Sequence, residues 1–366
     1  MSKRLEVSYN KKPCYNIMLE KDFTALAGEL EDLELKNRRF CIVTDSQVEE
    51  LYAAELKEIL AFWAEQVEIF SFPAGEASKT LDTVRELYGF LIEKHFERKD
   101  ILIALGGGVV GDLTGFAAAT YLRGIDFIQV PTSLLAQVDS SIGGKTGVDF
   151  DQYKNMVGAF KMPRLVYINL AVLSSLDNRQ FYNGFAEVMK HGLIKDAIFY
   201  EWMISHLYEI DERDPAVLEE MIYRSCQIKK AVVEKDPTEQ GERALLNFGH
   251  TIGHAIEKYM NFSLLHGECV ALGSVAAAFI SWKKGYLSDE EYYEVRDMFV
   301  PFQLPISIEN IEADRIIALT RSDKKMEQGQ IKFILLKKIG KAIIDKTVTE
   351  EEMINGIEEI IYRNEE

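Results

Sequence analysis

The chain has 366 residues, more than one compact core usually takes, so two domains are expected. With 47% hydrophobic and 28% charged residues, its composition is that of a globular protein and excludes disordered and fibrous classes. The formal net charge of −17 repels phosphate backbones, which argues against nucleic acid as a partner.

The first half of the chain alternates short β-rich runs with amphipathic helical stretches. Strands are expected at 38–45, 67–75, 100–108, 126–131 and 164–170. Helices are expected between the first four of them, over 46–66, 80–96 and 109–122. Strands separated by helices of this length predict a parallel sheet that is covered on both faces.

The second half has helical spacing instead. Long amphipathic segments occupy 199–210, 216–235 and 267–287, and one short run at 330–336 has strand character. The change of pattern near 175–182 predicts two domains, 1–178 and 179–366. The expected fold is an α/β N-terminal domain, with a parallel sheet and a Rossmann-like nucleotide site, followed by a mainly α-helical C-terminal domain.

The cysteines and the N-terminus indicate where in the cell the protein is located. Cys14, Cys41, Cys226 and Cys269 form no CxxC pair, which favours reduced thiols over disulfides or a thiolate zinc site. The first residues lack the apolar core of a signal peptide, and no apolar run approaches the length of a membrane span. A cytoplasmic protein without a membrane partner is expected.

A glycine-rich turn follows the third strand. In "ALGGGVVGDLTG", Gly106, Gly108 and Gly111 form a G-x-G-x-x-G pattern between a strand and a helix, where a backbone without side chains can approach a diphosphate. The acidic residue expected after the next strand is missing, because "FIQV" runs into Pro131. Asp45, after the first strand, is an earlier candidate for the ribose, and Glu76 and Lys79 offer further polar contacts. A structural turn without a ligand is the alternative.

A second glycine-containing stretch, "SSIGGKTG" at 140–147, is not a nucleotide triphosphate loop. That motif needs a glycine where Asp139 stands. Lys145 is instead expected to lie exposed in a glycine-flanked loop where it meets an anion, and Lys154 and Asn155 follow shortly after.

Histidines suggest a metal. Five of the six fall between 191 and 266, and His250 and His254 lie one helical turn apart. Thr251 replaces the glutamate of the H-E-x-x-H motif, so this is not a zinc protease. Glu187 and His266, with one or both of His250 and His254, would satisfy a catalytic zinc site. Two histidines at this spacing also arise by chance.

Basic and amide side chains surround these motifs, an exception in so acidic a chain. They suggest an anionic substrate, such as a carboxylate or phosphate, although any one of them alone is more often a solvated surface charge. They are Lys190, Lys229, Arg243, Asn247, Lys324 and Lys325.

Several motifs together resemble the 3-dehydroquinate synthase family of sugar phosphate cyclases. They are "GGGVVGDLTGFAAATYLRG", "FIQVPTSLLAQVDSSIGGKTGV", "KNMVGAF", "GFAEVMKHGLI", "RALLNFGHTIGHAIE" and "LLHGECVALG". The resemblance runs from about 40 to 340, with the expected spacing between motifs. Glycerol dehydrogenase and the iron-containing alcohol dehydrogenases are more distant relatives.

The resemblance implies conversion of 3-deoxy-D-arabino-heptulosonate 7-phosphate to 3-dehydroquinate and phosphate, in the shikimate pathway of aromatic amino-acid biosynthesis. NAD oxidises a substrate hydroxyl transiently, phosphate leaves by β-elimination, the ketone is reduced again and an aldol step closes the ring. A divalent metal, zinc with cobalt as the alternative, lowers the pKa of the hydroxyl that is oxidised. The implied enzyme is an NAD- and metal-dependent carbon–oxygen lyase and a homodimer.

The resemblance also implies the roles of individual residues. The metal ligands are Glu187, His250 and His266, while His254 contacts substrate and relays a proton. Substrate is held by Lys145, Asn155, Lys190, Lys229, Arg243, Asn247, one of Lys324 and Lys325, and Arg123 of the partner subunit. Asp139 and Lys154 match the polar region between cofactor and substrate. NAD contacts match Asp45, Glu76, Lys79, Gly107, Gly108, Asp112, Thr132 and Ser133.

One motif departs from the family. The usual Thr-Leu-Pro-Pro-Arg-Glu at the domain junction is replaced by "SSLDNRQ". Ser175 keeps the hydroxyl that the resemblance assigns to NAD. Loss of both prolines predicts a less restricted hinge.

Three other interpretations of the protein's function remain open at this point. A sister cyclase, such as 2-deoxy-scyllo-inosose synthase or a valiolone-type synthase, acts on a sugar phosphate without the carboxylate. A glycerol-type dehydrogenase accumulates NADH with a simple polyol. The third is a non-catalytic metal-binding or regulatory protein on the same scaffold.

Overall fold

The computed structural model of the chain describes residues 2–151, 153–321, 326–327 and 330–363. The chain divides into two compact units, Met1–Leu176 and Asp177–Glu366, which are described separately below. Among the helices of the described residues, none has the length and apolar character needed to cross a membrane.

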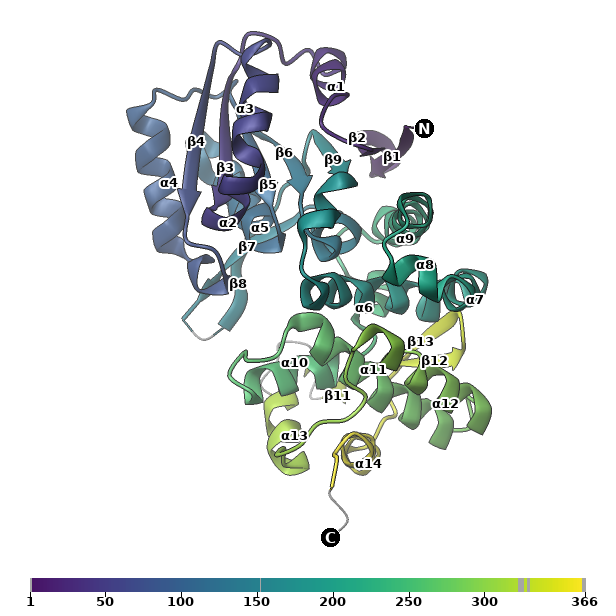
Figure 1. Ribbon diagram of the computed structural model, residues 1–366. Coiled ribbons are helices and arrows are strands. Elements are labelled where there is room, and N and C mark those ends of the chain that lie inside the picture. The colour runs from purple at the N-terminus through teal and green to yellow at the C-terminus, as the bar shows by residue number, and fades with distance from the viewer. Residues whose placement is uncertain (1, 152, 322–325, 328–329, 364–366) are drawn as a thin grey trace. The chain divides into compact units, whose positions relative to one another are not determined.

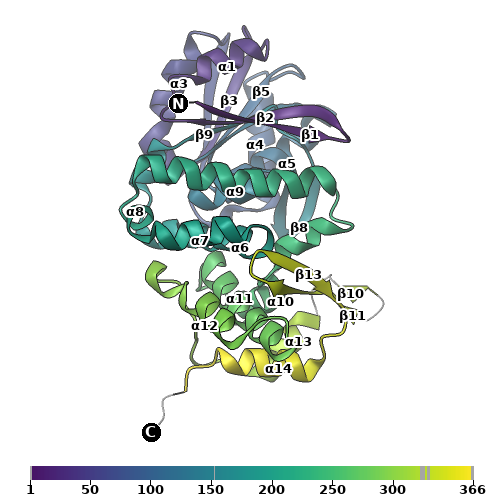
Figure 2. The ribbon, with the colours of Figure 1, turned by 90° about the vertical axis from the view of Figure 1, so that its right-hand side faces the viewer.

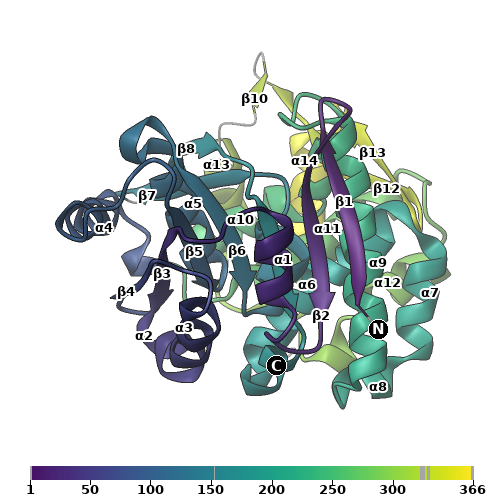
Figure 3. The same cartoon turned by 90° about the horizontal axis from the view of Figure 1, so that it is seen from above.

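The first unit is built on a seven-stranded sheet with the order β1-β2-β9-β6-β5-β3-β4 (Figure 1). All neighbouring pairs are parallel except β1 and β2, which run antiparallel and lie side by side in Figure 3. The strands are β1 (Lys3–Tyr9), β2 (Lys12–Glu20), β3 (Arg39–Asp45), β4 (Gln66–Phe72), β5 (Ile101–Gly106), β6 (Asp126–Pro131) and β9 (Leu165–Asn169).

Helices cover both faces of this sheet, as the sequence predicted. Successive side chains of a strand point to opposite faces, so Ile42 and Ile103 pack with α1 (Leu26–Asp32) and α3 (Ala54–Ala61). Their neighbours on the same strands, such as Cys41 and Leu102, pack on the other face with α4 (Leu81–Glu93) and α5 (Gly108–Thr120). The predicted α/β class is confirmed.

Some local predictions in this unit were wrong. The strand predicted at 67–75 ends at Phe72, because Pro73 has no N–H for the ladder and Gly75 has a φ of 111°. The helix predicted over 46–66 is divided into α2 (Ser46–Val48), a π-helical turn (Glu49–Ala53) and α3. The predicted loop around Lys145 is the start of an antiparallel hairpin, β7 (Lys145–Phe150) and β8 (Tyr153–Phe160).

The second unit is mainly helical, as predicted. Its central helix, α11, packs against α6, α10, α12 and α14 (Figure 2). The helices are α6 (Asn178–Lys195), α7 (Ala197–Ser205), α8 (Leu207–Asp211), α9 (Pro215–Lys235), α10 (His250–Tyr259), α11 (His266–Lys283), α12 (Asp289–Asp297), α13 (Ala313–Arg321) and α14 (Glu350–Glu359). The strands are β10 (Met326–Glu327), β11 (Gln330–Ile331), β12 (Phe333–Lys338) and β13 (Lys341–Asp345).

Close approach of α10 and α11 depends on glycine. A Cβ at Gly273 would lie 1.9 Å from the backbone oxygen of Gly249, and one at Gly253 would lie 2.7 Å from the oxygen of Cys269. The start of α11 is also tied to α6, because Asn183 Oδ1 accepts the N–H of Gly267 at 2.5 Å. The starts of α10 and α11, which bear His250 and His266, are thereby held close to α6, which bears Glu187.

Candidate metal and nucleotide sites

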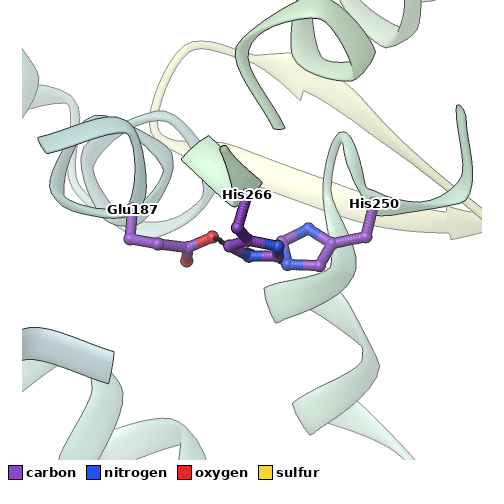
Figure 4. A group of neighbouring side chains, drawn as sticks. All are labelled: Glu187, His250 and His266. Carbon is purple, nitrogen blue, oxygen red and sulfur yellow. Dashed lines mark ion pairs between the residues drawn. The ribbon is translucent and has the colours of Figure 1, made fainter. Parts of the chain in front are cut away.

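The three predicted metal ligands lie together in the second unit. Glu187 is on α6, His250 is the first residue of α10, and His266 is the first residue of α11. Their side chains point toward one another (Figure 4), and one ligand atom from each lies within 4.8 Å of the others. Glu187 is fully buried and His250 nearly so, so bulk water competes weakly for this position.

The spacing of these atoms fits a small divalent cation. Glu187 Oε1 lies 3.5 Å from His250 Nε2 and 3.4 Å from His266 Nε2. Ligands at about 2.1 Å from an ion and at tetrahedral angles lie about 3.4 Å from one another. One carboxylate and two imidazoles are also a usual donor set for catalytic zinc, so both the distances and the residue types fit.

The protonation of the two imidazoles follows from their neighbours. His250 Nδ1 lies 3.0 Å from the carbonyl oxygen of Phe248, and because a carbonyl only accepts, Nδ1 carries the proton and Nε2 of the neutral ring keeps its lone pair. Burial opposes protonation of His266, but the carboxylates of Glu187 and Glu257 outweigh it and raise the pKa of His266 to about 9. A cation bound here therefore displaces a proton.

A second group in this unit shares His266. His254, Glu257 and His266 also have ligand atoms within 4.8 Å of one another, and Glu257 Oε2 lies 4.0 Å from His266 Nδ1. Sequence reasoning missed Glu257. The signal was present, because positions 250, 254 and 257 have the i, i+4, i+7 spacing of one helical face. The Glu187 group has the shorter distances.

Lys190 and His191 have different surroundings. Lys190 is buried and forms an ion pair with Glu187, one turn earlier on α6. His191 Nδ1 lies 2.7 Å from Ser225 Oγ on α9, which engages one nitrogen of this buried ring.

Apart from Lys190 on α6, the described residues predicted to bind an anion in the second unit come from α9 and from the 3-10 helix that follows it, Glu242–Asn247. Lys229 and Arg243 are buried, at 5% and 3% exposure. Arg243 donates from Nη1 to the Pro237 carbonyl at 2.7 Å, and Asn247 donates from Nδ2 to Glu239 at 2.9 Å. Lys324 and Lys325 lie outside the described residues.

The predicted nucleotide contacts of the first unit gather at the carboxyl ends of its parallel strands. Asp45 ends β3, Gly107 and Gly108 follow β5, and Thr132 and Ser133 follow β6. Connections leave β3 and β5 in opposite directions across the sheet, and ligands bind at such a switch point in open α/β sheets. Gly108 opens α5, where the first N–H groups of the helix are available to an anion.

Neighbouring atoms restrict two of these residues, Gly108 and Asp45. A Cβ at Gly108 would lie 3.1 Å from Ser140 Oγ, so this turn has little room for a side chain. Asp45 Oδ1 accepts the N–H groups of Gln47 and Val48 at 3.0 Å, which fixes the carboxylate at the start of α2.

Lys79, Asp112 and Asn155 form a polar cluster in the first unit. Lys79 Nζ lies 2.6 Å from Asp112 Oδ2 and 2.6 Å from Asn155 Oδ1. Burial opposes a charged Lys79, but the carboxylates around it, Asp112 above all, together outweigh burial and raise the lysine's pKa. Burial raises the pKa of Asp112, and Lys79 offsets only part of this rise. A pocket of about 350 Å³ lies beside the cluster, and Asp112, Lys145 and Asn155 line it.

The remaining predicted residues are more dispersed. Lys154 Nζ lies 3.6 Å from Glu76 Oε1. Asp139 is in the short π-helix that follows β6. The Ser175 hydroxyl lies 2.6 Å from the hydroxyl of Tyr52, and Arg123 is exposed beyond the far end of α5 from the glycine turn. The geometry shows where these residues lie, and the predicted roles of all the site residues, including Ser175 and Arg123, stay predictions.

Family models match most of the chain. The 3-dehydroquinate synthase N-terminal model matches residues 69–183, and the 3-dehydroquinate synthase C-terminal model matches residues 184–326. The matched ranges contain both the glycine turn and the group of Glu187, His250 and His266.

Curated relatives agree with this result. A 3-dehydroquinate synthase from Acetivibrio thermocellus is 43% identical over 343 residues, which is 94% of this chain and 95% of the relative. A 3-dehydroquinate synthase from Nitrosospira multiformis is 45% identical over 315 residues, which is 86% of each.

Solved structures of sugar phosphate cyclases have the same fold. A 2-epi-5-epi-valiolone synthase from Streptomyces hygroscopicus, with NAD⁺ and Zn²⁺ bound, has a TM-score of 0.88 at 27% identity and covers 97% of this chain and 99% of its own. A 2-deoxy-scyllo-inosose synthase with carbaglucose-6-phosphate, NAD⁺ and Co²⁺ has a TM-score of 0.86 at 27% identity, with the same coverage.

Proposed function

The chain belongs to the 3-dehydroquinate synthase family, and on this premise we propose that it converts 3-deoxy-D-arabino-heptulosonate 7-phosphate to 3-dehydroquinate and phosphate. The reaction comprises a transient oxidation, a β-elimination, a reduction and an intramolecular aldol closure. Because carbon–oxygen cleavage releases the phosphate, the enzyme is a lyase. The observation that carries the proposal is the group of Glu187, His250 and His266, within a chain that is 43% identical to a 3-dehydroquinate synthase over 94% of its length.

Two bound groups supply chemistry that the side chains lack. NAD, when bound, accepts a hydride from the substrate and returns it, so that no net oxidation results. A divalent metal, zinc or cobalt, polarises the hydroxyl that is oxidised and lowers its pKa. Two sister cyclases of known structure carry NAD⁺, one with Zn²⁺ and the other with Co²⁺.

The chain's own residues bind and orient these groups. Glu187, His250 and His266 would hold the metal, and the Phe248 carbonyl keeps the His250 Nε2 lone pair available for it. Two further side chains lie next to this position. Lys190 forms an ion pair with Glu187, and the ring centroid of His254 lies 5.1 Å from that of His250. We assign substrate contact to both, and proton relay to His254.

The buried cations of the second unit are suited to an anionic substrate. Lys229 and Arg243 are assigned to its carboxylate, hydroxyl and phosphate groups, as are Asn247, Lys145 and Asn155. Buried cations favour such a ligand, because their charges are little screened by water. Lys79, Asp112 and the glycine turn are assigned to NAD.

A homodimer and a cytoplasmic location remain predictions. Arg123 of the partner subunit would complete the phosphate site of a dimer. If so, a mixture of Arg123→Ala and His250→Ala subunits regains activity on exchange of subunits, since one hybrid site has both intact residues. Sedimentation as a monomer at working concentration would contradict the dimer.

The sister cyclases are the second candidate, because their structures are similar to this one over almost the whole chain. The distinguishing experiment measures phosphate release from the heptulosonate phosphate and from glucose 6-phosphate, each with and without a chelator. We expect release from the heptulosonate phosphate only, and its loss on chelation. Turnover of glucose 6-phosphate alone would favour a 2-deoxy-scyllo-inosose synthase, and steady NADH accumulation with glycerol would favour a dehydrogenase.

A further inference from the structure

The segment that joins α9 to α10 is organised around one carboxylate. Asp236 directly follows α9, and Pro237 after it disfavours a helical conformation at Asp236, so the helix ends here. The segment then continues to the 3-10 helix Glu242–Asn247 and reaches His250 at the start of α10. It contains Arg243 and Asn247, two of the residues assigned to substrate.

Three backbone N–H groups of this segment donate to the Asp236 carboxylate. Gln240 donates to Oδ1 at 2.9 Å, while Gly241 and Arg243 donate to Oδ2 at 2.7 and 2.9 Å. Each bond to an ionised acceptor is stronger than one between neutral groups. Burial opposes ionisation of Asp236, but these N–H groups outweigh it and lower its pKa, so the carboxylate is charged at neutral pH.

The side chain of Arg243 is tied to the same point. Its Nη1 donates to the Pro237 carbonyl at 2.7 Å, so the guanidinium folds back toward the residue that follows Asp236. The backbone N–H of Arg243 and its guanidinium are therefore both held at the start of the segment. With 3% exposure, this arginine has little freedom to find another position.

We propose that Asp236 is a positioning residue that fixes the backbone of Arg243, and thereby the guanidinium, for the carboxylate or phosphate of the substrate. This inference rests on the proposed function, because it takes Arg243 as a substrate contact. Asp236 itself does not need to touch substrate, since its oxygens accept backbone N–H groups. Its removal frees the segment and weakens binding without removing a metal ligand.

The other end of α9 provides a matched control. Asp214, before the helix, accepts the N–H groups of Ala216 and Val217 at 2.9 and 3.0 Å. It is also a carboxylate that accepts backbone N–H groups at an end of the same helix, but it lies far along the chain from Arg243. Asp214→Ala therefore reproduces a loss of helix-end stability without the predicted effect on substrate.

The experiment compares Asp236→Ala, Asp236→Asn and Asp214→Ala in the metal- and NAD-loaded enzyme. Asp236→Ala is expected to raise the KM for the heptulosonate phosphate about tenfold, the effect of losing one charge-assisted hydrogen bond, and to change kcat much less. Asp236→Asn keeps one acceptor oxygen and should give an intermediate KM. Asp214→Ala should leave KM at the wild-type value.

Two further measurements separate positioning from general damage. Bound zinc per chain should equal that of the wild type in all three variants. Amide hydrogen exchange should accelerate over 240–243 in Asp236→Ala but not in Asp214→Ala. Equal KM values in Asp236→Ala and Asp214→Ala, whether raised or unchanged, would overturn the inference. If Asp236→Ala does not fold, the KM of Asp236→Asn decides. Absence of phosphate release by the wild type would overturn the proposed function and the positioning role together.

Discussion

Individual side chains in the metal group are held by partners that sequence patterns do not reveal. Sequence spacing left open whether His250, His254 or both bind a metal. In the structure, the Phe248 carbonyl accepts a hydrogen bond from the Nδ1–H of His250, and Nε2 lies 3.5 Å from Glu187 Oε1. His254 is one turn further along α10 and belongs to the second group, with Glu257. Because ligand geometry depends on how the ring is oriented, we expect His250 to contribute more to metal affinity than His254 does.

Replacement of His250 tests this expectation. In His250→Ala, the loss of one of three protein ligands should reduce zinc affinity at least about 100-fold, more than loss of an outer-shell partner does, and phosphate release should fall with it. Competition with a metal-sensitive dye measures the affinity. His206→Ala is the matched control, because His206 is also in the second unit but its Nδ1–H donates to the Trp202 carbonyl, 2.8 Å away. Unchanged zinc affinity in His250→Ala would remove this residue from the ligand set.

At the scale of elements, the metal group depends on how closely helices approach one another. His250 and His266 begin α10 and α11, and those helices touch where Gly273 faces the backbone of Gly249. Packed interiors leave no space for an added methyl group at such a contact. The glycine therefore affects metal binding although it carries no ligand atom.

Gly273→Ala should separate the two helices. A Cβ 1.9 Å from a backbone oxygen cannot be accommodated by a rotamer change, so we expect a loss of about 3 kcal/mol or more in unfolding free energy and weaker zinc binding. Thermal unfolding and zinc titration measure the two effects. Gly89→Ala is the control, because a Cβ there meets no atom within 4 Å and alanine favours its helix, α4. Wild-type zinc affinity in Gly273→Ala would show that the contact is not required.

A second contact between helices should make a contribution to stability that depends on pH. Glu242 forms ion pairs with Lys195 on α6 and with Lys235 on α9. The hydrogen bond from Lys195, followed by that from Lys235, lowers the pKa of Glu242 in the folded state. A lowered folded-state pKa adds stability above the unfolded-state value of about 4.3 and loses it as the pH falls further.

Glu242→Gln should therefore be less stable than the wild type at pH 7, by about 0.5 to 1 kcal/mol, since the groups are partly exposed. The difference should shrink as the pH falls below about 4.3, where the wild-type glutamate also becomes neutral. Urea unfolding of both proteins at pH 7 and at a pH below about 4.3 measures this difference in stability. High salt should reduce the difference at pH 7. A difference that is independent of pH would indicate lost packing instead of lost charge.

At the scale of the whole molecule, ligand binding should be coupled to stability and activity. Anything that binds the folded state alone stabilises it, by about 2.7 kcal/mol at a concentration 100 times the dissociation constant. Because the proposed metal ligands come from three helices of one unit, a bound ion should cross-link α6, α10 and α11.

Removal of the metal by a chelator should therefore lower the unfolding temperature and abolish phosphate release, and zinc or cobalt should restore both. Calorimetry and the phosphate assay on the same sample measure these effects. Magnesium at the same concentration is the control, since it prefers oxygen ligands to imidazoles. Full activity in a sample from which the metal has been removed would contradict the metal's proposed role.

The sequence by itself determined the α/β and helical halves and the residue types at each motif. Periodicity and turn residues are local signals, so strands such as Ile101–Gly106 and helices such as Pro215–Lys235 were predictable. The N-terminal strands were not, although "KRLEVSY" alternates, because β2 adds to the sheet beside β9, which is far away in the chain. The pairing of β2 with β9 is non-local and leaves no local signature, whereas β1 and β2 pair locally as a hairpin with Tyr9 opposite Lys12.

The family resemblance implied the group of metal ligands, but only the tertiary structure shows which contacts bring side chains together. Glu187, His250 and His266 become neighbours because glycine lets α10 and α11 touch and Asn183 ties α11 to α6. The structure likewise directs the Asp236 carboxylate to three N–H groups of its own loop, and Glu257 toward His266. Contacts between side chains depend on packing between elements, which periodicity along a single element does not encode.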